Sequence, residues 1–267
     1  MPSFISYMGG KHSMSKKLIP LFPNHKRYVE VFMGSATVFF TKPRAQINIL
    51  NDKNSNLVNL FNMLKDNYKY LYNWVKCTPI SRELYDNYVE LLKSNDIQDR
   101  VQRAGMYMYL IRLSYNCQIE SGWSMAGFSR YVAWSNNWKE TLKWFSDFLD
   151  NVVIENMDFE RLIKTYDSND TFMYLDPPYY LADKTKYYEI VFNQTDHLRL
   201  FNVLKDTKCN WLVSYDNNDY IKQIYKDFNI QTISNPLPSG SKANYQQYKN
   251  EIIISNYQFP KQQYSLF

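Results

Sequence analysis

A carboxylate, two prolines and an aromatic ring follow one another at Asp176-Pro177-Pro178-Tyr179. The apolar run Phe172–Leu175 before them predicts a short buried strand, which must end where proline removes the backbone donors. Ligands bind at the carboxyl ends of strands in open α/β sheets. The turn suits a flat base with an exocyclic amine, because carboxylate and carbonyl oxygens accept its N–H groups and the tyrosine stacks on its ring. The alternative is a proline turn with a solvent-facing aspartate.

A second candidate ligand site lies earlier in the chain. Tyr28–Val31 predicts a strand, Gly34 a turn, and Ser35–Thr37 the start of an apolar helix. A helix N-terminus beside a glycine turn favours a bound ligand.

The next predicted strand, Gln46–Leu50, also ends in a carboxylate, since Asp52 lies 18 residues beyond Gly34. At that spacing, α/β nucleotide sites use a carboxylate to accept from ribose hydroxyls. The alternative is that Asp52 belongs to a helix cap. Both hold if Asn54 or Ser55 is the cap and Asp52 is left for the ribose.

The Asp176–Tyr179 motif resembles the catalytic motif of amino-group DNA methyltransferases, and the DPPY form is typical of those that act on adenine N6. The chain as a whole resembles the Dam-type (D12 class, alpha-group) DNA adenine-N6 methyltransferases. This resemblance implies an α/β, Rossmann-like methyltransferase fold with a seven-stranded mixed sheet and a mainly helical target-recognition insertion. It implies S-adenosylmethionine as cofactor and double-stranded DNA as partner, with Asp176, Pro177, Pro178 and Tyr179 holding a flipped-out adenine.

Other segments carry the cofactor side of the resemblance. Residues 7–11, YMGGK, resemble the family's opening motif, in which tryptophan usually stands where this chain has Tyr7. Residues 32–34 resemble an F-x-G motif that often has a further glycine at the position of Ala36, and residues 51–60 resemble a D-x-N-x-x-L segment. Asp158-Phe159 resembles a strand ending in N-x-D-F, although a helix start there is the alternative. The implied cofactor-binding residues are Tyr7, Gly9, Gly10, Lys11, Glu30, Phe32, Gly34, Asp52, Asp158, Phe159 and Asp176.

Residues 61–149 interrupt the alternation of strands and helices. Helical periodicity predominates at Tyr68–Val75, Arg82–Leu92, Val101–Leu113 and Trp138–Leu149, whereas Ser114–Trp134 predicts a hairpin or exposed loop. Family members carry DNA specificity in an insertion at this place. The resemblance thus implies a catalytic domain of residues 1–60 plus 150–267 and a recognition insertion of residues 61–149. Expected base or phosphate contacts are Arg112, Asn116, Ser124 and Arg130, with Tyr115 or Trp123 as a wedge in the base stack.

The remaining chain predicts the rest of the sheet. The expected strands are Val152–Asp158, Trp211–Ser214, and a closing antiparallel pair, Asn229–Ser234 and Asn250–Ser255; the expected helices are Thr195–Leu204, capped by Thr195, and Asp219–Phe228. The connection Pro236–Lys249 is either a DNA contact through Lys242 or a simple exposed loop. The tail Gln263–Phe267 resembles the Q-x-S-L-F peptide that docks on the replication sliding clamp.

Composition limits the remaining classes. The net charge of the 267 residues is +5, and residues 1–60 alone carry eight Lys/Arg against two carboxylates, a net of +6, which suits phosphate contacts. No run approaches the roughly 18 apolar residues of a membrane span, and no signal peptide is evident, so we expect a cytoplasmic chain without membrane contact. Three cysteines and three histidines are too scattered for a metal site. Alternatives are methylation of cytosine N4, RNA adenine or a glutamine side chain, or a DNA-binding protein without catalysis, and a restriction-modification setting is one possibility.

Overall fold

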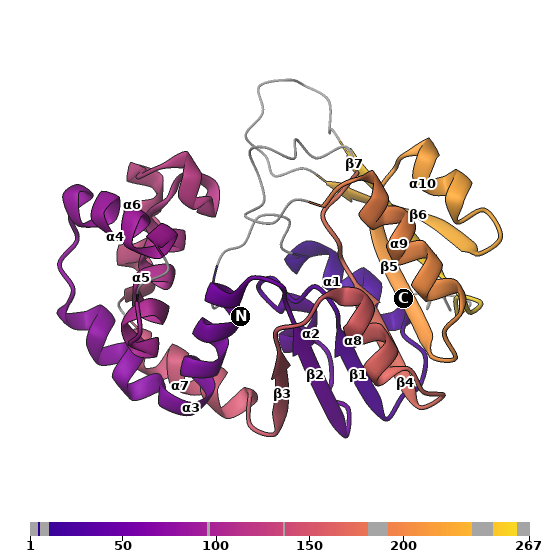
Figure 1. The fold of residues 1–267 in the computed structure, drawn as a ribbon, viewed down its shortest axis with the longest axis horizontal. Helices are drawn as coiled ribbons and strands as arrows, with labels where there is room; N and C mark the ends of the chain where they lie inside the picture. The colour runs from indigo at the N-terminus through magenta and orange to yellow at the C-terminus, as the bar shows by residue number, and fades with distance from the viewer. Residues whose placement is uncertain are drawn as a thin grey trace, which may run out of the picture.

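The computed structural model describes Ile5 and residues 11–94, 97–135, 137–180, 192–236 and 248–260. A mixed sheet lies beside a lobe of helices (Figure 1). The strands are β1 (Arg27–Glu30), β2 (Ile47–Asn51), β3 (Val152–Glu155), β4 (Thr171–Leu175), β5 (Asn210–Asp216), β6 (Asn229–Pro236) and β7 (Tyr248–Ser255). Their order in the seven-stranded sheet is β3-β2-β1-β4-β5-β7-β6. Strands β1 to β5 run parallel, and β7 is antiparallel to both β5 and β6. The predicted Rossmann-like methyltransferase fold is confirmed.

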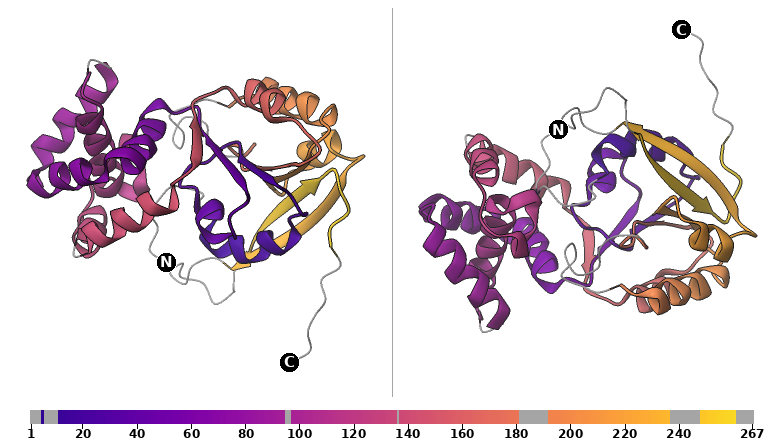
Figure 2. Two further views of the ribbon diagram at one scale, coloured as in Figure 1. Left: turned by 90° about the horizontal axis from the view of Figure 1, so that it is seen from below. Right: turned by 90° about the horizontal axis from the view of Figure 1, so that it is seen from above.

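Both faces of the central strands are covered. Along β4, Phe172 and Tyr174 enter one apolar cluster, and Met173 and Leu175 enter the other, as a strand period of two requires. Helix α1 (His12–Leu18), the 3₁₀ turn η1 (Ile19–Leu21) and α2 (Thr37–Thr41) cover the first face. Helices α8 (Phe159–Tyr166), α9 (Gln194–Lys205) and α10 (Asp219–Ile224) cover the second. Figure 2 shows the indigo and orange helices on opposite sides of the sheet.

The helical lobe is built around one buried helix. It contains α3 (Ser55–Cys77), α4 (Arg82–Ser94), α5 (Arg100–Leu113), α6 (Met125–Ser135) and α7 (Trp138–Phe148), with short 3₁₀ turns at Tyr115–Cys117 and Ile119–Ser121. Every residue of α5 from Ala104 to Leu113 is buried, because α3, α4 and α6 all pack on it. A helix enclosed on all sides carries no polar stripe. Helix α3 runs across the predicted domain boundary at residue 60, so one helix belongs to both parts.

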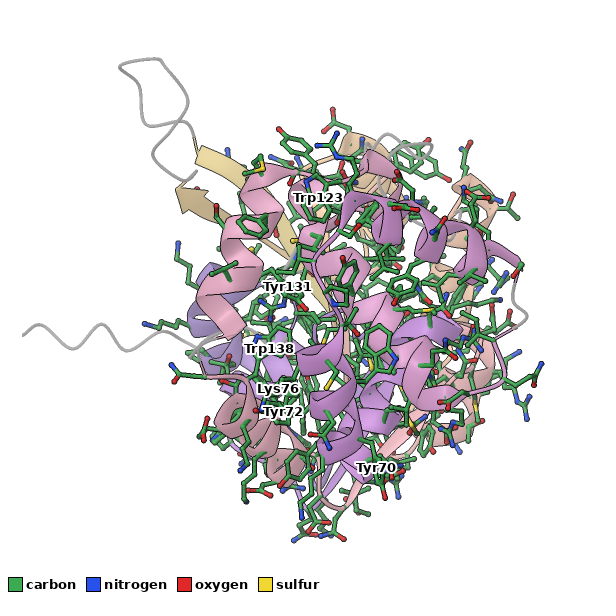
Figure 3. The ribbon with its side chains drawn as sticks, turned by 90° about the vertical axis from the view of Figure 1, so that its left-hand side faces the viewer. Tyr70, Tyr72, Lys76, Trp123, Tyr131 and Trp138 are labelled. Carbon is green, nitrogen blue, oxygen red and sulfur yellow. The ribbon has the colours of Figure 1, made fainter. Side chains whose placement is uncertain are left out.

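Several local expectations differ from the structure. The segment 114–134 is neither hairpin nor simple loop, since a single bridge between Ser114 and Trp123 is followed by helix α6. That helix approaches α5 closely because Gly127 lies against the backbone of Leu113. Its far end packs through Tyr131 on Trp138, with ring centroids 5.0 Å apart (Figure 3).

Two further differences concern helix starts. Helix α9 is capped by Asn193 rather than Thr195, because Asn193 and Asp196 form a reciprocal capping box. Strand β3 ends at Glu155, and Asp158 caps α8, which is the alternative that the sequence left open. By contrast, the expected cap at Asn54 is confirmed, since its side chain accepts from two backbone N–H groups of α3. None of the helices in the described ranges is long and apolar enough to span a bilayer.

Candidate active site

The candidate site has two parts, and the first is built around Asp176, which follows the carboxyl end of β4. This strand lies between β1 and β5, so the motif emerges from the middle of the sheet. Asp176 Oδ1 lies 2.9 Å from Lys11 Nζ and accepts a 2.8 Å hydrogen bond from the Ser214 hydroxyl. Neither contact among the described residues uses Oδ2, and the side chain remains 20% exposed. Asp176 is thus held through one oxygen while the other is available to a ligand.

Tyr179 is held by its hydroxyl group. It accepts from Lys11 Nζ at 2.6 Å and donates to Glu251 Oε2 on β7 at 2.7 Å. The Lys11 ammonium also lies 4.7 Å from the centre of the Tyr179 ring. One residue further on, the backbone N–H of Tyr180 donates to Asp216 on β5. Side chains from the neighbouring strands β5 and β7 therefore fix the proline turn.

The electrostatics of this cluster are those of charges removed from water. Burial raises the pKa of Asp176, whereas Lys11 and the hydrogen bond from Ser214 oppose that change. Burial also raises the pKa of Tyr179 well above 10, and the charges of Asp176 and Glu251 add to the effect. Tyr179 therefore keeps its proton, and its hydroxyl donates to Glu251 while it accepts from Lys11.

The second part of the site joins the ends of β1 and β2. Gly34 has a φ of +46°, and its N–H donates to Asp52 Oδ2 at 3.1 Å. The other carboxylate oxygen of Asp52 accepts from the N–H of Asn54 at 2.9 Å. Burial raises the pKa of Asp52, and these backbone hydrogen bonds oppose the shift. A carboxylate has about four acceptor positions, so Asp52 retains capacity for a ligand.

Ala36 has a backbone conformation that glycine adopts more readily. Its φ of +50° and ψ of +31° are left-handed, and the residue serves as the N-cap of α2. A side chain in this conformation costs roughly 1–2 kcal/mol. The buried methyl group is accommodated here without any break in the strand–turn–helix path.

Glu30 turns away from this edge. Its carboxylate is buried and accepts from the Tyr28 hydroxyl at 2.8 Å and from the N–H of Phe39 in α2 at 3.1 Å. Burial raises the pKa of Glu30 to about 8, although these hydrogen bonds and Lys42 oppose the shift. The structure thus places Glu30 between β1 and α2, where it supports the turn from behind.

Three phenylalanines form the apolar wall of the second part. The Phe32 ring lies 5.8 Å from Phe159 and 5.8 Å from Phe192, and the last two are 5.6 Å apart, centre to centre. The Arg199 guanidinium lies 4.3 Å from the centre of the Phe159 ring. The same arginine donates to both oxygens of Asp158 at 2.7 and 2.6 Å. Burial would raise the pKa of Asp158, but hydrogen bonds from Arg199, the N–H of Glu160 and Lys53 lower it overall.

Several residues that organise the site were not predicted. Asn51 donates to the carbonyls of Val31 and Met157 and accepts from the N–H of Met157, which ties three strand ends together. The others are Ser214, Glu251, Phe192 and Arg199. The available signals were positional: Ser214 lies near the carboxyl end of an apolar strand, and Glu251 is the one acid in the run EIIIS.

The residues expected to contact DNA have different surroundings in the structure. Arg112 is buried in the lobe at 5% exposure, and the Ser124 hydroxyl accepts from the N–H of Gly127 as the cap of α6. Tyr115 is 54% exposed, whereas the Trp123 ring packs edge-on against Tyr85. The side chains of Asn116 and Arg130, together with Tyr7, Gly9, Gly10, Lys242 and Gln263–Phe267, lie outside what the structure describes. Across the described ranges, no group of three His, Cys, Asp or Glu side chains is placed to hold a metal ion.

Comparison with known proteins identifies the family to which this chain belongs. The family described as D12 class N6 adenine-specific DNA methyltransferase matches residues 7–235. Type II methyltransferase M1.LlaDCHI of Lactococcus lactis subsp. cremoris is 30% identical over 95% of both chains. Type II methyltransferase M.CviBI of Paramecium bursaria Chlorella virus NC1A is 24% identical over 85% of this chain and 88% of its own. A DNA adenine methylase of Haemophilus influenzae is 27% identical over 66% of this chain and 63% of its own. The chain belongs to the D12 class N6 adenine-specific DNA methyltransferases.

Proposed function

We propose that this adenine-specific DNA methyltransferase uses S-adenosylmethionine to methylate the N6 amino group of an adenine flipped out of duplex DNA, with Asp176 and Tyr179 holding the base. The observation that carries the proposal is the arrangement of Asp176: a carboxylate anchored through Oδ1, with Oδ2 uncommitted among the described residues, at the end of the central strand. Extrusion is required because N6 is otherwise hidden in a base pair.

The proposed chemistry centres on the adenine nitrogen. Its lone pair is delocalised into the ring, so N6 is a poor nucleophile. When Asp176 Oδ2 and the carbonyl of Pro177 accept its two N–H groups, the nitrogen shifts toward a tetrahedral form. The lone pair then forms the N–C bond, N6 becomes cationic, and one of its protons leaves to Asp176 or to solvent. Tyr179 stacks on the base, which is worth roughly 1–3 kcal/mol.

The donor set of the second part fits S-adenosylmethionine. We assign Asp52 to the ribose hydroxyls, the Phe32–Phe159–Phe192 wall to the adenine ring, and Gly34 to close backbone approach. When bound, this cofactor supplies a methyl group on a cationic sulfonium and leaves as a neutral thioether. Asp158 is also assigned to this site, and its charge is already balanced by Arg199. Glu30 supports the turn from inside the core. Lys11 serves the base side, because its contacts are to Asp176, Tyr179 and Glu251.

The helical lobe supplies DNA recognition in this proposal, and residues 61–149 form the recognition insertion. Tyr115 is the better candidate wedge, since its ring is exposed and that of Trp123 is packed in the lobe. The tail Gln263–Phe267 is proposed to dock on the sliding clamp. Deleting its last two residues should then abolish capture of this protein by immobilised clamp, and unchanged capture would exclude the docking. With DNA as substrate, we place the protein in the cytoplasm. Two of the matched relatives are named Type II methyltransferases, which favours a restriction-modification setting.

The test is a methylation map at single-base resolution of a plasmid carrying this gene in a methylation-free host. We expect N6-methyladenine in one short recognition sequence. Unmodified plasmid from cells that contain folded protein able to bind S-adenosylmethionine would overturn the DNA-substrate assignment and direct attention to RNA or another amine. N4-methylcytosine would overturn the assignment of the base.

A further inference from the structure

Lys11 lies between two carboxylates that come from different strands. Its ammonium is 2.9 Å from Asp176 Oδ1, at the end of β4, and 3.6 Å from Glu251 Oε2, on β7. The side chains of Lys11 and Glu251 are only 6% and 7% exposed, so water screens little of their charge. With one ammonium against two carboxylates, the formal net charge of the cluster is −1.

Glu251 is an unusual residue for its strand. It faces Ile233 of β6 and Asp216 of β5 in register, and the four residues after it, Ile252 to Ser255, are all buried. An ionised carboxylate in such a place requires partners. Glu251 finds them at the DPPY turn: the Tyr179 hydroxyl donates to it at 2.7 Å, and Lys11 lies beside both.

The presence of a second carboxylate has a consequence for Asp176. Lys11 alone would neutralise Asp176 and weaken it as an acceptor for an amino group that becomes positive during transfer. A further negative charge on the far side of the same ammonium offsets that effect. Preorganised charge of the correct sign, aimed at developing charge, is a major source of catalysis.

We propose that Glu251 is a positioning residue for methyl transfer: it holds Lys11 and the Tyr179 hydroxyl, and its negative charge, added to the neutral Lys11–Asp176 pair, keeps the cluster anionic while adenine N6 gains positive charge. This inference rests on the proposed function, in which Asp176 accepts the adenine amino group. Under this proposal, strand β7 affects the reaction indirectly, through the contacts of Glu251 with Lys11 and Tyr179.

The test uses single-turnover methyl transfer to a DNA duplex that carries the mapped recognition sequence. Glu251→Gln keeps the size of the side chain and an oxygen that accepts from Tyr179, but it removes the charge. We expect the transfer rate to fall by about tenfold or more, with the Kd for S-adenosylmethionine within about twofold of that of the wild type. A wild-type rate in a protein that is folded and binds cofactor would overturn the proposal.

The second arm separates a role of the charge from a role in packing. Lys11→Met removes the ammonium that neutralises Asp176, so the double variant Lys11→Met/Glu251→Gln should transfer faster than Glu251→Gln alone, by about threefold or more. If Glu251 only pairs with Lys11 to support the fold, the double variant will be no faster, and that result would overturn the proposal.

A third arm distinguishes failure of this inference from failure of the proposed function, and it measures the transfer rate of Asp176→Asn in the same assay. If Asp176→Asn is inactive while Glu251→Gln transfers at the wild-type rate, only the role proposed for Glu251 is overturned. If Asp176→Asn transfers at the wild-type rate, the role proposed for Asp176 is overturned as well.

Discussion

The polar residues at the carboxyl end of the central strands and those of the helical lobe have opposite roles. At the carboxyl end of β4, Lys11, Asp176 and Glu251 are distant in sequence, yet they meet in one largely buried cluster at the DPPY turn. In the lobe, Arg112 is buried and Ser124 caps a helix. Asp176 follows the parallel strand β4, and the antiparallel strand β7 brings Glu251 into register with Asp216 at the carboxyl end of β5. The sheet topology therefore brings these residue types together into a site. A helical lobe gives no such guarantee, and its polar residues first serve the fold.

The largest effect that we expect is on the pH dependence of folding stability, and it comes from Glu30 in the sheet domain. The folded protein keeps a proton on Glu30 that the unfolded chain releases above pH 4.5, because burial raises its pKa to about 8. Stability therefore falls as pH rises through this interval, by up to roughly 5 kcal/mol from this group. Glu30→Gln, which is neutral at every pH, should flatten the decline measured by urea unfolding at pH 5, 6, 7 and 8. Parallel profiles for the two proteins would contradict the assignment.

The next effect concerns packing within the lobe. A β-carbon on Gly127 would lie 2.3 Å from the carbonyl oxygen of Leu113, which is backbone and cannot move aside easily. We expect Gly127→Ala to lower the free energy of unfolding by about 1–3 kcal/mol and to weaken methylation of DNA more than cofactor binding. Ala126→Ser, at an exposed position of the same helix, is the matched control and should change stability by less than about 0.5 kcal/mol. Equal stability of the two variants would show that α6 does not depend on this close approach.

A smaller effect should come from the exposed aromatic of the lobe. Tyr115→Ala is expected to slow transfer to duplex DNA by about 10–100-fold, because the ring no longer fills the gap left by the flipped base. Stability should be unchanged, since Tyr115 is 54% exposed. Tyr70→Ala is the control, because Tyr70 is 67% exposed on α3 (Figure 3). If both variants transfer at the wild-type rate, Tyr115 is not the wedge.

The smallest effect separates a cap from a base contact. Ser124→Ala removes the oxygen that accepts from the N–H of Gly127, and loss of an N-cap costs about 1 kcal/mol. We expect that loss of stability together with an unchanged recognition sequence. Ser129→Ala, at an exposed position in the same helix, should have little effect on either. Altered base preference in the Ser124→Ala methylation map would instead place this hydroxyl on DNA.

The sequence was sufficient where chemistry and topology coincide in a short stretch. The strand before Asp176, the strand before Gly34 and the carboxylate at Asp52 all lie where the pattern of apolar runs and turns predicts. Ser214 and Glu251 escaped prediction because only the packing of β5 and β7 brings them to Asp176 and Tyr179. The same limit applies to Arg199, which reaches Asp158 from a helix 41 residues later.

In the helical lobe, the sequence was not sufficient to predict the roles of individual residues. Glycine, serine and aromatic residues in 114–134 favour a loop by composition, but Gly127 is needed for close helix contact and Ser124 for a helix cap. Arg112 was selected for its charge, although its place in α5 buries it. Residue type alone does not distinguish a polar side chain that supports a helix from a polar side chain that binds DNA.

The most direct test of the account is the single-turnover rate of methyl transfer by Asp176→Asn, with cofactor affinity measured on the same protein. The variant keeps the size of the side chain and removes the negative charge that is to accept from adenine N6. We predict a loss of about 10³-fold in rate with unchanged affinity for S-adenosylmethionine. Transfer within about tenfold of the wild-type rate would contradict the central claim that the carboxylate at the end of β4 activates the adenine amino group.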